Sequence, residues 1–262
     1  MNWRPRLVAL DIDGTLTPVG SNDISPAVKA AITRVAEHGT HVVLCTGRSL
    51  IGTTPIAAQL PASHAVCSNG AVWWDPATGE VIRRTTFDPG PTIKALQALL
   101  PGAVFAIEQT GVGNLSLGRF LPDDLWGVTT DATFDEIAAT PTPRLVMRWL
   151  DHTPAELSFA VRNLEMSGIE WSVDHTEAWL TAVPENVTKG SALEELGQEL
   201  GIGAQDALAI GDGSNDVEML KWAGLGVAMG QAPAHVQAAA DAVAPTVLED
   251  GAAEVLGRFF PA

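Results

Sequence analysis

Two acidic residues stand one residue apart at the end of an apolar run near the start of the chain. The run LVAL at residues 7–10 is followed by DIDG, which contains Asp11 and Asp13. An ionised carboxylate resists burial unless a partner compensates it, and two carboxylates at one place resist it more. The segment predicts either a solvated strand end or a site that holds both acids together.

The spacing of Asp11 and Asp13 suits a site for a divalent cation. Side chains two residues apart on a strand face the same way, roughly 7 Å apart, and Gly14 lets the backbone turn beside them. Carboxylates supply the oxygen ligands that Mg²⁺ prefers, or divide the work between a nucleophile and a proton-transfer group. Because ligands bind at the carboxyl ends of strands in open α/β sheets, we expect both side chains to face one crevice.

A second apolar run ends in groups that suit an anion. The segment VVLCTGR closes with Thr46, Gly47 and Arg48. A hydroxyl, free backbone N–H groups and a guanidinium at a strand end make an anion site. An ordinary strand-to-helix turn is the alternative.

Two later segments add charge of both signs. The segment GDGSND contains Asp212, Asn215 and Asp216. A helix cap rich in Asp and Asn would explain Asn215 or Asp216 but not Asp212, so these acids indicate a bound cation. Lys189, at the start of a predicted helix, opposes the helix dipole. It can either balance carboxylates and an incoming phosphate or simply be solvated.

The elements that would position these residues alternate between strands and helices. Short, nearly continuous apolar runs are typical of parallel strands covered on both faces. They occur at residues 7–12, 41–45, 64–68, 207–213 and 225–229. Helix signals, which include capping residues and leucine stripes, predict helices at residues 26–38, 188–201, 215–224, 233–243 and 251–260. This order predicts an α/β fold with a parallel, three-layer sheet.

The middle of the chain has a different pattern. Residues 144–151 and 169–183 alternate with the period of antiparallel strands exposed on one face. Between them, Thr153 and Glu156 have the spacing of a capping box that opens a helix. We expect an inserted α+β domain over residues 85–185 with a mixed sheet and at least two helices. Candidates for lining a pocket, although each also fits a core or surface position, are Glu108, Arg119, Arg148, Trp149 and Trp179.

Composition narrows the possible partners and compartment. The 262 residues carry a net charge of −16, which argues against binding nucleic acid or an anionic membrane. Arginines and a short apolar run at the start do not make a signal peptide, and no apolar run is long enough to cross a bilayer. We therefore expect a cytoplasmic protein, a monomer or homodimer, with Cys45 and Cys67 as buried reduced thiols.

Taken together and in this order, the segments DIDGTLT, LCTGR, Lys189 and GDGSND resemble the haloacid dehalogenase-like superfamily of phosphohydrolases. The phrases CSNGA and VTKGSAL look like its Cof-type branch. The resemblance covers residues 5–84 and 186–250, and the insert matches by position and size only. It implies a Rossmann-like core formed by residues 1–84 and 186–262, with a type-IIB cap over residues 85–185.

The same resemblance implies roles for individual residues. Asp11 would be the nucleophile that forms an aspartyl-phosphate, and Asp13 the general acid that protonates the leaving group and then activates water. Thr46 and Gly47 would bind the phosphoryl oxygens, and Lys189 would neutralise the nucleophile and the phosphate.

The metal and substrate residues are implied in the same way. Mg²⁺ would be held by Asp11, Asp212 and the main-chain carbonyl of Asp13. Asp216, with Asn215, would orient that metal shell or Lys189. Arg48 and Asn69 would face the same crevice, where, with Asn215, they would contact the substrate.

These roles describe a Mg²⁺-dependent phosphatase for a small phosphorylated metabolite, such as a sugar phosphate or a cofactor phosphate. Two alternatives stay open at this stage. A phosphomutase with the same cap would return the phosphoryl group to the sugar, and a catalytically idle protein would only bind the metabolite. A binding module has no need of a nucleophile beside a proton-transfer acid, which favours an enzyme.

Overall fold

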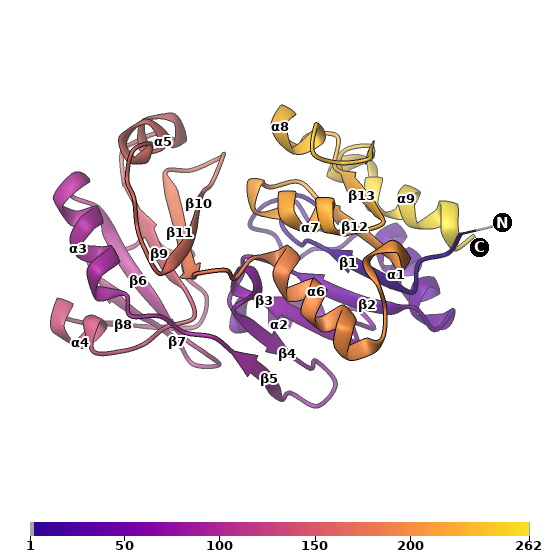
Figure 1. Cartoon of the computed structure of the whole chain (residues 1–262), viewed down its shortest axis with the longest axis horizontal. Helices are drawn as coiled ribbons and strands as arrows, with labels where there is room; N and C mark the ends of the chain where they lie inside the picture. The colour runs from indigo at the N-terminus through magenta and orange to yellow at the C-terminus, as the bar shows by residue number, and fades with distance from the viewer. Residues whose placement is uncertain (1–2, 262) are drawn as a thin grey trace.

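The computed structural model describes residues 3–261, which form two sheets with their own helices (Figure 1). The larger sheet has eight strands in the order β14-β13-β12-β1-β2-β3-β4-β5. Its strands are β1 (Leu7–Leu10), β2 (His41–Cys45), β3 (His64–Cys67), β4 (Val72–Trp74), β5 (Val81–Arg84), β12 (Ala207–Gly211), β13 (Leu225–Ala228) and β14 (Ala242–Val243).

Neighbouring strands from β14 to β3 run parallel, while β4 and β5 are antiparallel additions at one edge. The central strand β1 shows why its sequence is apolar throughout. Val8 and Leu10 join one buried cluster, and Leu7 and Ala9 join a second cluster on the opposite face. A strand with both faces covered has no solvent side to carry polar residues, so the predicted three-layer α/β core is confirmed.

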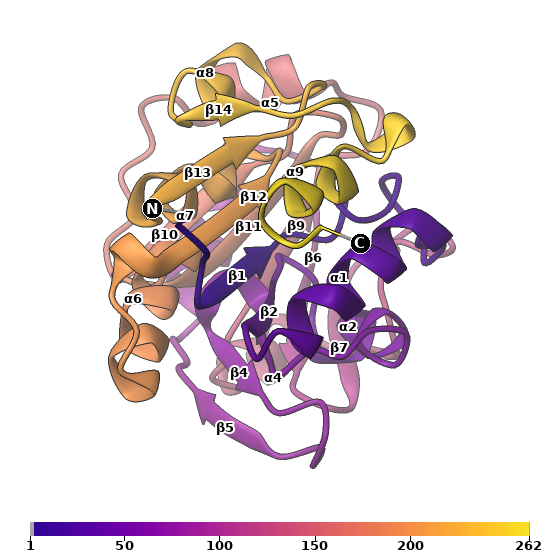
Figure 2. The ribbon, with the colours of Figure 1, turned by 90° about the vertical axis from the view of Figure 1, so that its right-hand side faces the viewer.

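Helices cover both faces of this sheet (Figure 2). One face packs against α1 (Pro26–Glu37), α2 (Leu50–Ala57) and α9 (Gly251–Phe259). The other face packs against α6 (Lys189–Leu200), α7 (Val217–Trp222) and α8 (Ala234–Gln237). Ser25 caps α1 by accepting a hydrogen bond from the backbone N–H of Val28, as its side-chain type predicts.

The second sheet has six strands in the order β10-β11-β9-β6-β7-β8. They are β6 (Val104–Gln109), β7 (Gly113–Leu117), β8 (Val128–Asp131), β9 (Leu145–Arg148), β10 (Ile169–Val173) and β11 (Trp179–Pro184). All its pairs are antiparallel except β7 with β8. Helices α3 (Gly90–Leu99), α4 (Phe134–Ala138) and α5 (Pro154–Val161) accompany it, and the expected α+β insert with a mixed sheet is confirmed.

One helix prediction is wrong over half its length. Residues 233–243 are helical only in α8, and the segment then adds β14 to the edge of the sheet. The alanine-rich sequence favours a helix. However, Asp241 exchanges hydrogen bonds with Gly226, which draws the chain alongside β13. Tertiary pairing overrides local preference at this point.

Helix α2 and the edge strands β4 and β5 of the larger sheet were not predicted. Helix α2 contains Pro55 in its interior, which removes a backbone donor and normally argues against a helix. Its burial against the core compensates, because Leu50, Ile56 and Ala57 all belong to the apolar cluster on that face.

The thiols of Cys45 and Cys67 are unpaired and buried, as predicted. Burial raises the pKa of Cys67 to about 12, so it stays protonated at neutral pH. None of the helices within residues 3–261 combines the length and the apolarity that crossing a membrane requires.

Candidate active site

The first two acids come from neighbouring strands. Asp11 follows β1 and Asp212 follows β12, two strands that pair in parallel register, and the backbone N–H of Asp11 donates to the carbonyl of Ile210. The backbone at Gly14, which has a φ of 78°, lies close to the side chain of Asp212. A Cβ atom at Gly14 would lie 2.2 Å from Oδ2 of Asp212. The glycine of DIDG is therefore required by the second acidic loop as well as by its own turn.

Lys189 reaches the same point from the first turn of α6. Its Nζ donates to Oδ1 of Asp11 at 2.6 Å and to Oδ1 of Asp216 at 2.5 Å. The side chain is fully buried, and charge-assisted hydrogen bonds of this length are strong. The adverse helix dipole at this position is outweighed by two carboxylates in direct contact.

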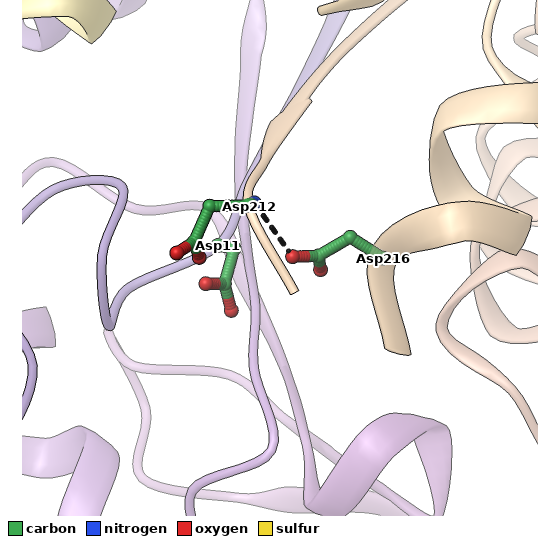
Figure 3. Close-up of side chains that lie close together, drawn as sticks. All are labelled: Asp11, Asp212 and Asp216. Carbon is green, nitrogen blue, oxygen red and sulfur yellow. Dashed lines mark hydrogen bonds between the residues drawn. The ribbon is translucent and has the colours of Figure 1, made fainter. Parts of the chain in front are cut away.

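Asp216 organises the loop that carries Asp212. Its Oδ2 accepts from the backbone N–H of Asp212 at 2.9 Å and of Gly213 at 2.8 Å, while its Oδ1 faces Lys189. Figure 3 shows the three carboxylates converging, with the dashed line marking the contact to the Asp212 backbone. Both oxygens of Asp216 are thus already used by the protein.

The oxygens that remain suit a hard divalent cation. One carboxylate oxygen from each of Asp11, Asp212 and Asp216 lies within 4.8 Å of the others, and because Asp216 is already bound by Lys189 and its own loop, those of Asp11 and Asp212 are the ones left for a cation. Within residues 3–261, the second oxygen of Asp11 accepts no hydrogen bond, and the carboxylate of Asp212 accepts one, from Nε2 of Gln231 at 3.4 Å. A donor set made only of carboxylate oxygens matches the preference of Mg²⁺.

The electrostatics of the cluster also call for more positive charge. Burial, and then Asp216, raise the pKa of Asp11 well above its ordinary value, although Lys189 opposes the shift. Burial and Asp216 raise the pKa of Asp212 to about 7. Burial alone would lower the pKa of Lys189, but Asp11 and Asp216 hold it above its ordinary range. One ammonium does not balance three buried carboxylates.

Thr46, Gly47, Asn69 and Asn215 lie together at the wall of the same cavity. Nδ2 of Asn215 donates to Oδ1 of Asn69 at 2.9 Å. The backbone N–H of Asn69 donates to the carbonyl of Thr46 at 3.0 Å, and a Cβ on Gly47 would lie 3.1 Å from Oδ1 of Asn69. The predicted anion-binding loop and the predicted amides are therefore neighbours.

The carboxylate of Asp13 lines the cavity and is bound by Arg48. Nε of Arg48 donates to Oδ2 and Nη2 donates to Oδ1, both at 2.7 Å. The side chain of Asp13 stays 32% exposed, whereas that of Arg48 is 5% exposed. The two acids of DIDG thus face one cavity, as expected, but have different cationic partners.

The second sheet supplies the rest of the cavity, whose volume is about 780 Å³. Of the insert candidates named from the sequence, Trp179 lines it. Lining residues from the insert that the sequence did not single out include Asp123, Asp124, Trp126, Arg144, Asp174, His175 and Glu177. Loops from separate strands supply them, and no pattern in the sequence relates these loops to each other.

A buried ion pair joins the two sheets beside this cavity. Oε2 of Glu108 accepts from the hydroxyl of Ser68 at 2.5 Å and from Nε of Arg144 at 3.2 Å. Nη1 of Arg144 donates to the carbonyl of Gly47 at 3.3 Å. A glutamate inside the apolar strand β6 was the one signal in the sequence for this contact.

A family model described as haloacid dehalogenase-like hydrolase matches residues 8–107 and 146–256. A phosphoglycolate phosphatase of Natronomonas pharaonis is 30% identical over 260 residues, covering 96% of each chain. The pyridoxal phosphate phosphatase YbhA of Escherichia coli is 27% identical over 263 residues, covering 91% of this chain and 92% of its own.

Solved structures show the same fold. The phosphatase BT1666 from Bacteroides thetaiotaomicron has a TM-score of 0.79 at 25% identity, covering 98% of this chain and 95% of its own. The subclass IIB sugar phosphatase BT4131 has a TM-score of 0.81 at 22% identity, covering 97% and 98%.

Proposed function

This chain belongs to the haloacid dehalogenase-like hydrolases, and from that premise we propose that it is a Mg²⁺-dependent phosphatase acting through an aspartyl-phosphate. The observation that carries the proposal is the contact of Lys189 with Asp11 beside Asp212 at the ends of adjacent strands. A buried nucleophile, an ammonium and a second acid at one place fit phosphoryl transfer, which depends on positioning and charge stabilisation.

The first half-reaction uses Asp11 and Asp13. One carboxylate oxygen of Asp11 attacks phosphorus as the ester bond to the leaving group breaks, and the other oxygen would remain available to the cation. Lys189, which donates to Oδ1 at 2.6 Å, stabilises this carboxylate. Asp13 donates its proton to the departing alkoxide. Water then attacks the phosphorus and gives a proton to Asp13. The bond between phosphorus and the Asp11 oxygen breaks, so inorganic phosphate is released and the Asp11 carboxylate is restored.

Other residues bind the phosphoryl group and the cation. We assign the phosphoryl oxygens to the hydroxyl of Thr46, the backbone N–H of Gly47 and the ammonium of Lys189, with Asn69 and Asn215 beside them. Asp11, Asp212 and the main-chain carbonyl of Asp13 would hold Mg²⁺, with Asp216 positioning Lys189 and the Asp212 loop. When bound, Mg²⁺ supplies positive charge to the phosphoryl oxygens.

The cavity wall from the insert indicates the class of leaving group. We assign residues 85–185 as a cap whose wall carries Asp123, Asp124, Asp174 and Glu177. Arg144 is paired with Glu108, and Arg148, behind the wall, is paired with Asp124 and Glu177. Asp123 and Asp174 therefore carry the negative charge of this wall that is not balanced by an ion pair among the described residues. A wall with this balance disfavours a second negative charge on the substrate. We therefore favour a sugar phosphate or a cofactor phosphate without a carboxylate or second phosphate.

The test is release of inorganic phosphate from 4-nitrophenyl phosphate, with Mg²⁺ and with EDTA. Mg²⁺-dependent release supports the phosphatase, and no release from any substrate would leave only a binding protein. Conversion of a sugar monophosphate to its isomer without free phosphate would instead identify a phosphomutase. A panel comparing hexose phosphates with phosphoglycolate tests the charge argument, which fails if phosphoglycolate is preferred.

A further inference from the structure

We infer that Arg48 is a positioning residue that fixes the proton-transfer acid Asp13, and that Trp126 from the cap holds Arg48 in place. The sequence placed Arg48 among the substrate ligands, and it does line the cavity. The inference rests on the proposed function, since it gives Asp13 the role of acid. It adds two residues that position this acid: Arg48 from the core and Trp126 from the cap.

The guanidinium of Arg48 has no donor left for a substrate. An arginine has five N–H groups. Nε and one N–H of Nη2 bind the carboxylate of Asp13, and the second N–H of Nη2 donates to the carbonyl of Ser21 at 2.8 Å. Nη1 donates to Oδ1 of Asn22 at 2.7 Å and to the carbonyl of Gly52 at 3.2 Å. A bound phosphate would have to break one of these contacts.

The same contacts restrict Asp13 to one orientation. A bidentate arginine fixes the plane of a carboxylate as well as its position. The backbone N–H of Gly20 adds a contact at 3.2 Å to Oδ1, the oxygen that also faces Nη2. A carboxylate has about four acceptor positions, two on each oxygen. Oδ1 accepts from Arg48 and Gly20, and Oδ2 accepts from Arg48 alone, so the remaining position lies on Oδ2. That oxygen is the one that carries the proton to the leaving group.

Trp126, an aromatic residue of the cap, reaches this pair. The centre of the Trp126 ring lies 5.3 Å from the Arg48 guanidinium. Nδ2 of Asn114 donates to the backbone carbonyl of Trp126 at 2.8 Å. The ring also packs on Gly52, where a Cβ atom would lie 2.8 Å from its Cδ1. Because Gly52 also binds Arg48 through its carbonyl, one residue of α2 contacts both partners.

This arrangement couples the position of the cap to the position of the acid. When Trp126 sits on Gly52, it covers the guanidinium, and a cation over an aromatic face is attracted more strongly away from water. When the cap moves away, Arg48 loses this cover, and its contacts with Asp13 become exposed to water, which weakens them. Proton transfer to the leaving group is thus favoured when the cap is seated on the core.

The experiment uses the leaving group as its readout, in the full-length protein with Mg²⁺. Phenolate needs a proton to depart, whereas 4-nitrophenolate departs with little assistance. Release of the phenol in a single turnover, with enzyme in excess, reports only the first half-reaction. The variants are Asp13→Asn as the limiting case, Arg48→Lys, which keeps the charge but loses the bidentate geometry, and Gly52→Ala, which displaces Trp126.

We expect Asp13→Asn to slow phenyl phosphate by about 10²-fold or more while 4-nitrophenyl phosphate changes far less. Arg48→Lys and Gly52→Ala should show the same selective loss, smaller in size. Gly52→Ala should stay folded, because the preference of alanine over glycine in a helix offsets part of the packing lost when Trp126 is displaced, and thermal melting checks this. The control is Arg83→Lys, an exposed arginine with two glutamate partners and a tryptophan face outside the cavity, which should leave both rates unchanged.

The possible outcomes separate this inference from the proposed function. If Asp13→Asn is selective but Arg48→Lys slows both substrates equally, Arg48 acts on the phosphate or on folding, and the inference is overturned. If Arg48→Lys is selective but Gly52→Ala is not, the coupling through Trp126 is overturned. If Asp13→Asn itself shows no selectivity, the acid assignment in the proposed function fails, and the inference fails with it.

Discussion

At the scale of residues, the site consists of three acidic side chains around one lysine. Asp11, Asp212 and Asp216 are each at most 5% exposed, and Lys189 is 1% exposed. Ions removed from water are costly unless their partners compensate them fully. Lys189 compensates two of the carboxylates directly, which leaves Asp212 without a cationic contact. The excess negative charge is the physical reason to expect a dication here.

Asp11→Asn tests the nucleophile. We expect turnover to fall by about 10⁴-fold or more, because an amide cannot attack phosphorus. We expect the melting temperature in EDTA to stay level or rise, since one of the like charges is removed. Steady-state kinetics and thermal melting followed by circular dichroism measure both. The control is Asp135→Asn, an exposed acid in the first turn of α4 outside the cavity. Appreciable residual turnover of Asp11→Asn, with the control behaving as wild type, would contradict the assignment.

Asp212 makes the stability of the metal-free protein depend on pH. Its pKa is about 7 in the folded chain against an ordinary value of 3.8. Between these values the folded state holds a proton that the unfolded state has released, so stability falls as pH rises through the window. Melting in EDTA between about pH 4 and about pH 7 measures this fall. Stabilisation by added Mg²⁺ should grow over the same range.

The control for this pH dependence is Asp212→Asn, which removes the titrating group but keeps a polar side chain. We expect its melting temperature in EDTA to vary less with pH than that of the wild type. An unchanged slope would mean that other groups, such as Asp11, dominate the titration.

At the scale of elements, the first turn of α6 decides where Lys189 points. Thr188 caps the helix by accepting from the backbone N–H of Ser191, and Ser191 accepts from the backbone N–H of Thr188. The carbonyl of Thr188 lies 2.6 Å from where a Cβ on Gly70 would be, so the cap also abuts the CSNGA segment. Local capping and close packing thus set the direction of the ammonium.

Thr188→Ala tests whether this cap matters for more than stability. Losing an N-cap costs about 1 kcal/mol, and here the helix start that frays carries Lys189. We expect kcat to fall clearly in addition to the loss of stability. Thr153→Ala removes the equivalent cap of α5 in the second sheet and should cost similar stability with little change in kcat. Urea denaturation measures the loss of stability of each variant. The prediction is contradicted if the two variants lose similar stability and also lose kcat to the same extent.

At the scale of the whole molecule, charge opposes the proposed substrate. A net charge of −16 repels a phosphate dianion at long range, while the charges proposed to attract it, Lys189 and a bound Mg²⁺, act only at the site. Salt screens the long-range repulsion over roughly 8–10 Å at moderate ionic strength. Under the proposed function, substrate binding would have to overcome the repulsion from the net charge of the whole molecule.

We expect kcat/KM for an aryl phosphate to rise by about two- to fivefold as KCl increases from about 10 to about 200 mM with Mg²⁺ saturating. The rise should appear in kcat/KM and not in kcat, because it concerns encounter with the substrate. Repeating the series with a second monovalent salt controls for specific ion effects. A fall in kcat/KM would show that local attraction dominates the approach.

The sequence by itself determined the parallel core and the identity of the acids and the lysine. Apolar runs that end in DIDG, TGR and GDG predict strands whose carboxyl ends share one edge, because parallel strands in one sheet point the same way. Hydrophobic periodicity and helix-capping residues depend only on neighbours in the sequence, so they predict helices and strands without knowledge of tertiary contacts. The same locality misled the prediction at residues 233–243, where pairing with β13 overrides the helix preference.

Only the tertiary structure decided which partner each charge has. Arg48 faces Asp13 instead of offering free donors, both oxygens of Asp216 are used by Lys189 and the loop, and Trp126 reaches across from the cap. These contacts join residues on separate elements, and their geometry depends on how the sheets and loops pack. Residue types and spacing along the chain carry no such information, because the direction of a side chain is set by everything packed around it.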